Sequence, residues 1–222
     1  MNQTNEGINN AATPTLVTYN EWQAAYNYFN EELFAGKLPE CIITLNRSAR
    51  LSGYFYPDKY NNKKGGIKDE LSMNPKYISN KNIFEALSTL VHEMCHVWQR
   101  HYGVNGFPGK YHNKEWGTEM KRIGLMPSRT GKPGGAETGS SMLDYVIEGG
   151  MFEKVCKQFI SKGFLISWTE VGAIPVCKGI DEVKEKSIKR RRYSCMSCEA
   201  EVWGIPGLKI TCDLCKSSFV LS

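Results

Sequence analysis

Two histidines and a glutamate lie at the spacing needed for metal-dependent hydrolysis. His92 and His96 are four positions apart in the stretch Leu-Val-His-Glu-Met-Cys-His-Val-Trp-Gln. On a helix this spacing projects both imidazoles from one face about a turn apart, with Glu93 beside them. Two neutral imidazoles can bind Zn²⁺, and the carboxylate can take a proton from a metal-bound water whose pKa the ion has lowered. The HExxH pattern therefore predicts a catalytic zinc site with Glu93 as the catalytic residue.

The surrounding sequence has the periodicity of a helix with one buried face. Apolar side chains recur at helical spacing between Ser79 and His101, and Gly103 lies just past the expected end. These side chains are Ile83, Phe84, Leu87, Leu90, Val91, Met94 and Trp98. Cys95 turns towards the core side, so we expect a buried thiol and not a ligand or nucleophile. The alternative to a metal site is a core helix whose histidines are four residues apart by chance.

A catalytic zinc ion needs a third protein ligand and one open position. The chain has four histidines, of which His101 is nine residues after His92. That offset rotates His101 off the ligand face, so we expect it on the surface at the helix end. His112 follows the glycine-rich turn from Gly103 to Gly109 and opens a second periodic segment closed by Gly124. A helix folded back across that turn would bring His112 to the metal.

In these blocks the sequence resembles the SprT-like zinc metalloprotease family (Spartan-related). The first block runs from His92 to His96, and the second, from His112 to Trp116, is similar to the third-histidine segment of that family. Upstream, Trp22 to Pro39 resembles the first helix and turn of the family, and Ser52 to Pro75 resembles its strand pair. The resemblance covers residues 17–126.

The resemblance implies an α+β fold: a zincin-like metalloprotease domain of helices and a small β-sheet. His92, His96 and His112 would hold a catalytic Zn²⁺, and Glu93 would activate water for the hydrolysis of peptide bonds. The substrate would be a protein, in particular one bound or crosslinked to DNA. By analogy with zinc peptidases, an edge strand at Ile67–Met73 would pair with extended substrate.

Three further side chains have two interpretations each. Glu115 lies one turn into the segment opened by His112, where its carboxylate would hold the second ring N–H of a ligand histidine. Alternatively, Glu115 is a helix acid favoured by the dipole. Tyr54 and Tyr56 would point their hydroxyls at the developing oxyanion, or they pack within a strand. The sequence leaves both questions open.

The composition is that of a globular protein with one medium and one small domain. The chain has 222 residues, 41% of them apolar, and a net charge of +5. This charge permits a polyanionic partner without demanding one. Residues 1–16 are rich in Asn and Thr, resemble neither a signal peptide nor an anchor, and are predicted to be disordered. No apolar stretch approaches the length of a membrane span, so we expect a cytoplasmic protein with no membrane partner.

Residues 17–126 are predicted to form the protease core. Thr18 to Glu21 has the spacing of a capping box and opens a helix that continues to Gly36. Three β-rich runs predict a small sheet with a hairpin, whose turn lies at Lys59–Gly66. The runs are Ile42–Leu45, Gly53–Tyr56 and Ile67–Met73.

Residues 127–183 are predicted to form a Gly/Pro-rich loop followed by an α/β extension. The loop, Pro127–Ser141, is either a flap near the mouth of the site or a plain linker. Apolar spacing from Phe152 to Ile160 predicts a short helix ended by Gly163. The stretch Phe164–Val171 is predicted to be a strand.

Residues 184–222 combine a basic segment with two CxxC pairs. The segment Lys184–Arg192 has six basic residues and one acid. In a chain with no secretion signal, two CxxC pairs separated by a β-hairpin predict a metal site and not disulfides. The ligands would be Cys195, Cys198, Cys212 and Cys215. This spacing indicates a small β zinc ribbon with one closed, structural Zn²⁺.

The ribbon suggests a nucleic-acid partner, with single-stranded DNA preferred, because basic and aromatic side chains bind phosphates and unstacked bases. The candidate residues are Lys189, Arg190, Arg191, Arg192 and Trp203. Alternatively, the metal only stabilises a short tail. Two rival functions remain: a non-catalytic nucleic-acid-binding zinc protein, and a peptidase with one dedicated protein target and no DNA dependence. Glu93 argues against the first, because a structural site does not require it.

Overall fold

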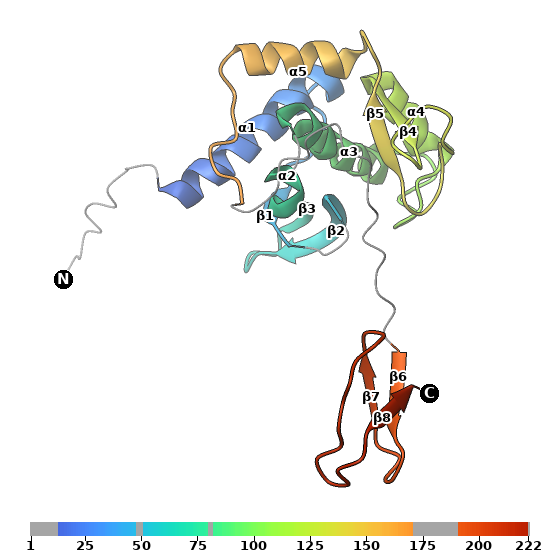
Figure 1. Cartoon of the computed structure of the whole chain (residues 1–222). Coiled ribbons are helices and arrows are strands. Elements are labelled where there is room, and N and C mark those ends of the chain that lie inside the picture. Colours follow the sequence, from blue (N-terminus) through green and yellow to red (C-terminus); the bar gives the residue numbers. More distant parts are fainter. Residues whose placement is uncertain (1–12, 48–50, 80–81, 171–190, 222) are drawn as a thin grey trace, which may run out of the picture. The chain divides into compact units, whose positions relative to one another are not determined.

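The chain forms two compact units, residues 1–176 and residues 177–222. The computed structural model describes residues 13–47, 51–79, 82–170 and 191–221 (Figure 1). None of the helices in these ranges is long and apolar enough to cross a membrane.

The first unit mixes helices and strands. Its helices are α1 (Pro14–Phe34), α2 (Pro75–Ser79), α3 (Ile83–Tyr102), α4 (Lys114–Ile123) and α5 (Met151–Ser161). Its strands are β1 (Ile42–Leu45), β2 (Gly53–Asn61), β3 (Ile67–Met73), β4 (Leu125–Ser128) and β5 (Leu143–Val146).

Helix α1 begins earlier than its sequence suggests. Thr13 is the N-cap, and its hydroxyl accepts the Leu16 N–H (3.4 Å). Pro14 occupies the first turn, where a backbone N–H is not needed. The predicted capping box at Thr18 is wrong, because Thr18 Oγ1 donates to the carbonyl of Pro14 (2.8 Å) inside the helix. Residues 14–16, assigned above to a disordered segment, are therefore helical.

The three-stranded sheet has the order β1-β3-β2, so β3 is its central strand. Strand β1 runs parallel to β3 and β2 runs antiparallel to it, which confirms the predicted sheet with a hairpin. The prediction that Ile67–Met73 is an edge strand is wrong. Residues 69–73 are buried in succession, as expected for a strand covered on both faces. The free edges of the sheet belong to β1 and β2.

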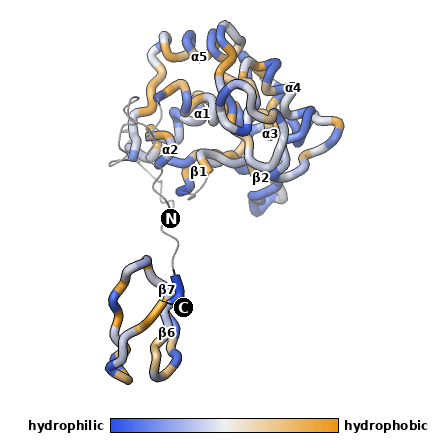
Figure 2. The backbone as a smooth tube through the Cα atoms, turned by 45° about the vertical axis from the view of Figure 1, so that its right-hand side comes forward, coloured by the Kyte–Doolittle hydropathy of each residue, from blue (hydrophilic) through white to orange (hydrophobic). Residues whose placement is uncertain are grey.

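Helix α3 is the centre of the first unit. Asn82 caps it by accepting the Glu85 N–H (2.9 Å), and residues 86–97 are all buried. The helix packs against α1, α4, α5, β2 and β3 (Figure 1). Hydrophobic and hydrophilic stretches alternate along the other long helices (Figure 2), as expected for elements with one buried face. The HExxH motif therefore lies in the middle of the core.

The segment after α4 forms a hairpin and not only a loop. Strands β4 and β5 pair antiparallel, with Leu125 opposite Val146. Residues 127–128, predicted to begin a loop, belong to β4, and the connecting loop is residues 129–142. A proline is tolerated in β4 because a two-stranded sheet has only edge strands.

Helix α5 confirms the helix predicted after this hairpin. The strand predicted for Phe164–Val171 is wrong over residues 164–170, which have no regular structure, and its last residue lies outside the described ranges. Phe164 instead stacks on Phe159 of α5 (ring centroids 4.1 Å apart), and the Ser167 N–H donates to a carboxylate of α1 (2.9 Å). Side-chain contacts hold this segment without a partner strand.

The second unit is a small antiparallel sheet in its described part. Its strands are β6 (Arg191–Cys195), β7 (Glu201–Gly204) and β8 (Phe219–Leu221), in the order β7-β6-β8. Tyr193 is buried, and its hydroxyl donates to the Ile205 carbonyl (2.8 Å). This sheet is too small to supply much apolar burial, so metal binding would contribute directly to its folding.

We expect Gly124→Ala to destabilise the first unit by about 2 kcal/mol or more. Gly124 ends α4 at φ 94°, and an added Cβ would lie 2.7 Å from the backbone nitrogen of Met151. Gly106→Ala is the matched control, because Gly106 also has a positive φ (68°) but no atom within 4 Å of the added Cβ. Gly106→Ala should lower the free energy of unfolding by only about 1 kcal/mol. Urea unfolding measures both, and equal losses would contradict the steric argument.

Candidate metal centre and active site

Three imidazoles converge on one point in the core of the first unit. The Nε2 atom of His112 lies 3.4 Å from Nε2 of His92 and 3.0 Å from Nε2 of His96. Ligand nitrogens about 2.0–2.1 Å from a tetrahedral zinc ion are about 3.3 Å apart, so these separations fit such an ion. All three side chains are buried. The predicted ligand histidines are therefore brought together, in an arrangement compatible with zinc.

Different elements supply the three rings. His92 and His96 lie one turn apart on α3, as the sequence predicts. His112 is not on a helix: it precedes Asn113, the N-cap of α4. A β-bridge to Gly139 holds it in place through backbone hydrogen bonds in both directions (2.8 and 3.1 Å). The helix predicted to open at His112 therefore begins two residues later.

Two ligand rings are oriented through their second nitrogen by residues that sequence reasoning missed. Nδ1 of His92 lies 2.9 Å from a carboxylate oxygen of Asp144 in β5, and Nδ1 of His112 lies 3.0 Å from the carbonyl oxygen of Gly139. With a proton on each Nδ1, the Nε2 lone pairs face the centre, as metal binding requires. Both partners come from the β4–β5 hairpin. The loop therefore forms part of the wall of the site and is not a plain linker.

Glu115 does not hold a ligand histidine. Its carboxylate accepts the backbone N–H groups of Val104 (2.6 Å) and Asn105 (3.2 Å) in the turn after α3. Partial burial by itself would raise the pKa of Glu115. The hydrogen bonds from Val104 and Asn105 outweigh it and lower the pKa. The prediction failed because it placed Glu115 and His112 on one helix. Glu115 instead fixes the turn that carries the chain from α3 to α4.

The environment of His96 and His112 favours their neutral forms. Burial, followed by the neighbouring rings of His92 and His112, lowers the pKa of His96 well below its usual value. Burial and His92 also lower the pKa of His112 to about 4, against the opposing effect of its hydrogen bond to the Gly139 carbonyl. Neutral imidazoles are the form that binds metal.

The buried ring of Trp116 packs against all three histidines. Its centroid lies 4.8 Å from the ring of His92, 5.3 Å from that of His96 and 4.4 Å from that of His112. This aromatic surface excludes water behind the ligands and limits the directions in which the rings can tilt. Cys95 is fully buried and burial raises its pKa, which confirms the predicted inert thiol.

Glu93 is buried beside the start of strand β2. A Cβ added to Gly53 would lie 3.1 Å from both Cγ and Oε1 of Glu93. Gly53 therefore brings edge strand β2 against the predicted catalytic carboxylate. Neither Tyr54 nor Tyr56 shares the face of β2 that Gly53 presents to Glu93, since side chains alternate along a strand. The oxyanion interpretation of these tyrosines is therefore wrong, and Tyr56 is exposed on the opposite face.

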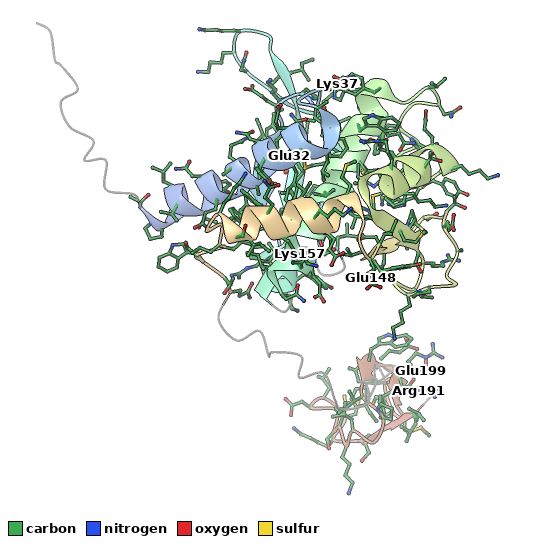
Figure 3. All side chains as sticks on the ribbon, turned by 90° about the horizontal axis from the view of Figure 1, so that it is seen from above. Glu32, Lys37, Glu148, Lys157, Arg191 and Glu199 are labelled. Atoms are coloured by element: carbon green, nitrogen blue, oxygen red, sulfur yellow. The ribbon has the colours of Figure 1, made fainter. Side chains whose placement is uncertain are left out.

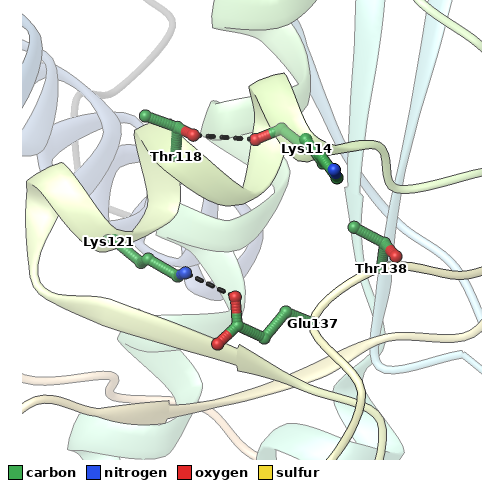
Figure 4. Close-up of a pocket in the computed structure, with 5 residues that line it drawn as sticks. All are labelled: Lys114, Thr118, Lys121, Glu137 and Thr138. Atoms are coloured by element: carbon green, nitrogen blue, oxygen red, sulfur yellow. Dashed lines mark hydrogen bonds and ion pairs between the residues drawn. The ribbon is translucent and has the colours of Figure 1, made fainter.

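A surface hollow lies between α4 and the loop at residues 129–142 (Figure 4). Its lining residues are Lys114, Thr118, Lys121, Glu137 and Thr138. Lys121 forms an ion pair with Glu137, and Thr118 Oγ1 donates to the Lys114 carbonyl (2.9 Å). None of the five is a ligand histidine, so the hollow is separate from the metal centre.

The second unit brings four cysteines together, all within 4.8 Å of one another. They are the predicted Cys195, Cys198, Cys212 and Cys215. The Sγ atoms of Cys198 and Cys212 are 3.7 Å apart, close to the separation of about 3.8 Å expected for two sulfurs on one tetrahedral zinc ion. Glu199 and Lys216, which follow the two CxxC pairs, both have a positive φ (61° and 54°). This four-cysteine cluster could therefore form a zinc ribbon.

The electrostatics of this cluster also fit a cation. Backbone N–H groups of Cys198 and Ser197 lower the pKa of Cys195 to about 7, which favours the thiolate that metals bind. Hydrogen bonding to Cys198 raises the pKa of Cys215 to about 12. A bound cation would favour the thiolate form of all four cysteines, because it offsets the repulsion between the sulfur charges.

Two of the predicted nucleic-acid-binding residues share a surface. Arg192 and Trp203 are directly opposite each other on β6 and β7, and the indole is 65% exposed. Arg191 is also exposed on β6 (Figure 3). Lys189 and Arg190 lie outside the described residues.

The described residues define the class of protein: a mixed helix and sheet scaffold with a three-histidine site in the first unit and a four-cysteine cluster in the second. The SprT-like family profile matches residues 22–133, half of the chain, so the chain belongs to the SprT-like family, which is generally metalloprotease-like.

One similar curated protein is named "Uncharacterized protein in mucB 3'region", from Salmonella typhimurium. It is 56% identical over 41 residues, which is 18% of this chain and 55% of that protein. The chain thus spans about half the length of that relative. No solved structure matches the chain.

We expect Asp144→Asn to weaken zinc binding at the histidine site by about 10- to 100-fold, because His92 loses the charge that orients its ring. Glu40→Gln removes an exposed carboxylate that pairs with Lys68 (3.2 Å) and should leave zinc affinity unchanged. Competition with a chelator measures both, and zinc in the four-cysteine cluster serves as an internal reference. Equal affinities in the two variants would rule out this role for Asp144.

We expect Gly53→Ala to reduce turnover about 10-fold at unchanged zinc content, because the new methyl group displaces Glu93 by a few tenths of an ångström. Gly117→Ala is the control, since its added Cβ meets atoms only at 3.6 Å or beyond. Peptidase assays with matched metal content measure the effect. Full activity in Gly53→Ala would show that this contact does not position the carboxylate.

Proposed function

We propose that this protein is a zinc-dependent endopeptidase. The observation that carries the proposal is the convergence of three buried imidazoles, two of them oriented through Nδ1, in the same helix region as the buried carboxylate of Glu93. Three protein ligands leave a tetrahedral ion one open position, which is typical of catalytic zinc and not of structural zinc. Membership of the SprT-like family supports the same conclusion.

Each residue of the site would have a separate role in peptide hydrolysis. His92, His96 and His112 would hold the ion, which when bound supplies Lewis acidity and lowers the pKa of water. Glu93 accepts a proton from the attacking water and later donates it to the nitrogen of the leaving amine. Asp144 keeps His92 in the required tautomer, and Trp116 keeps the site dry.

The fold supports a zincin-like arrangement in which substrate pairs with the sheet. The prediction assigned this role to β3, but the free edge beside α3 is that of β2, which begins at Gly53 next to Glu93. An extended peptide added along β2 would place its backbone near the catalytic carboxylate. We therefore assign substrate pairing to β2.

The proposed substrates are proteins bound or crosslinked to DNA. Arg191, Arg192 and Trp203 in the second unit would contact phosphates and unstacked bases, together with Lys189 and Arg190. This unit would then recruit the peptidase to single-stranded DNA, with one zinc ion in the four-cysteine cluster and one in the histidine site.

The test is proteolysis of a histone with and without single-stranded DNA. We expect Glu93→Gln at matched zinc content to reduce cleavage at least about 100-fold, because the proton acceptor is lost. Glu153→Gln, an acid on α5 paired with Lys157, is the control and should retain full activity.

The outcomes separate the rival functions. Cleavage that requires both DNA and Glu93 supports the DNA-linked peptidase. Cleavage that requires Glu93 but not DNA favours a peptidase with a dedicated protein target. DNA binding with no cleavage of any protein, in wild type as in Glu93→Gln, favours the non-catalytic nucleic-acid-binding protein and contradicts the proposal.

A further inference from the structure

The face of the β1-β3-β2 sheet opposite α3 carries tyrosines that the hydrolytic site does not use. Gly53 meets Glu93 on the inner face, and Phe55, two residues later, is buried on that same face. Side chains alternate along a strand, so Tyr54 and Tyr56 point to the outer face. They cannot serve the metal centre.

A bulge in β2 adds a third tyrosine to this face. Tyr56 is opposite Glu70 of β3, and Tyr60 is opposite Lys68, with the irregularity between them. Residues directly opposite each other in an antiparallel pair share a face, and positions two apart on β3 do as well. Tyr60 therefore lies beside Tyr56, and the three tyrosines follow one another along the outer face.

Two of these rings are fixed against the sheet. Tyr54 and Tyr60 both donate their hydroxyls to Oε1 of Glu70 (3.4 and 3.2 Å), a carboxylate that is itself only 5% exposed. The hydrogen bonds hold the hydroxyl ends down and limit the ring positions. Tyr56 is 54% exposed, and Nζ of Lys59 lies 4.6 Å from its ring centroid. Lys59 thus covers part of the Tyr56 ring, and a base would stack on the ring surface that Lys59 leaves exposed.

The hairpin that carries these tyrosines is strongly basic. Residues 59–68 contain four lysines and no acid, and all ten residues are exposed. Lys68 has a partner, the carboxylate of Glu40 (3.2 Å). Lys63 and Lys64, at the hairpin turn, extend the positive charge beyond the rings.

The acids that flank this segment are engaged elsewhere. Asp58 pairs with Arg100 of α3 (2.7 Å), and Asp69 pairs with His101 of the same helix (2.6 Å). These contacts also attach the hairpin to α3. Glu40 and Glu70 offset two of the four lysines, so the outer surface keeps a net positive charge.

We propose that this face binds single-stranded nucleic acid. We call it the tyrosine face: Tyr54, Tyr56 and Tyr60 with Lys59, Lys63 and Lys64. Bases of a single strand can stack on exposed aromatic rings whatever their sequence, while lysines neutralise the phosphates. A duplex keeps its bases stacked internally and would gain only the charge contacts. The proposal gives the proposed peptidase a second nucleic-acid contact, but binding at this face requires no hydrolysis.

The test measures binding of the full chain to a fluorescent oligothymidine by anisotropy. All variants carry Glu93→Gln, so that loss of cleavage cannot be confused with loss of binding. We expect Tyr56→Ala to weaken binding about 5- to 150-fold, the range for losing one stacked base. We expect Lys63→Ala with Lys64→Ala to reduce the slope of log affinity against log salt by about 1.4.

Matched controls distinguish binding at the tyrosine face from binding elsewhere on the surface and from binding by the second unit. Trp168→Ala removes an exposed aromatic ring elsewhere in the first unit, and Lys132→Ala with Lys154→Ala removes two exposed lysines. Both should leave affinity and salt slope unchanged. Trp203→Ala is also combined with Tyr56→Ala in one variant. The two losses of binding free energy should add, because the residues belong to different units.

Three results would overturn the proposal, whether or not the protein cleaves histones. The first is no binding of oligothymidine by the full chain. The second is wild-type affinity in Tyr56→Ala, which excludes stacking at this face even if the lysine pair matters. The third is loss of all affinity in Trp203→Ala alone, which assigns the binding to the second unit.

Discussion

The structure of the first unit depends on holding three imidazole nitrogens at about the spacing of ligands on one zinc ion. Nε2 of His112 lies 3.0 Å from Nε2 of His96, a separation that suits either one shared proton or a metal ion bound by both nitrogens. Hydrogen bonds at Nδ1 of His92 and His112 fix the tautomers, and Trp116 fixes the ring positions. The core of the unit thus contains a cluster of three histidines that could hold a metal ion.

This requirement explains the arrangement of the elements around α3. The helix is buried along its middle, so its polar side chains depend on neighbouring segments for partners. The β4–β5 hairpin supplies Asp144 and Gly139, the α3–α4 turn positions His112, and β2 brings Gly53 against Glu93. The family match ends at residue 133, before Asp144 and Gly139, so part of the site lies beyond it.

The two units combine different uses of metal-binding side chains. The histidine site has three ligands and a neighbouring carboxylate, which suits chemistry, whereas the four-cysteine cluster is closed and suits folding of a small sheet. Both units also expose aromatic rings next to basic side chains, at Tyr56 with Lys59 and at Trp203 with Arg192. A peptidase that acts on proteins held on nucleic acid would benefit from contacts in each unit.

The sequence by itself determined the candidate metal ligands, because residues a few positions apart in the chain set their spacing. Four-residue spacing places His92 and His96 on one helical face, and each CxxC pair forms its own turn. Tertiary structure alone decided that β3 is central, that Glu115 serves the α3–α4 turn and that Asp144 orients His92. Asp144 is 52 residues from His92, and no periodicity connects positions so far apart. Such contacts follow from how the sheet and hairpin pack on α3, which is set by burial of the whole core.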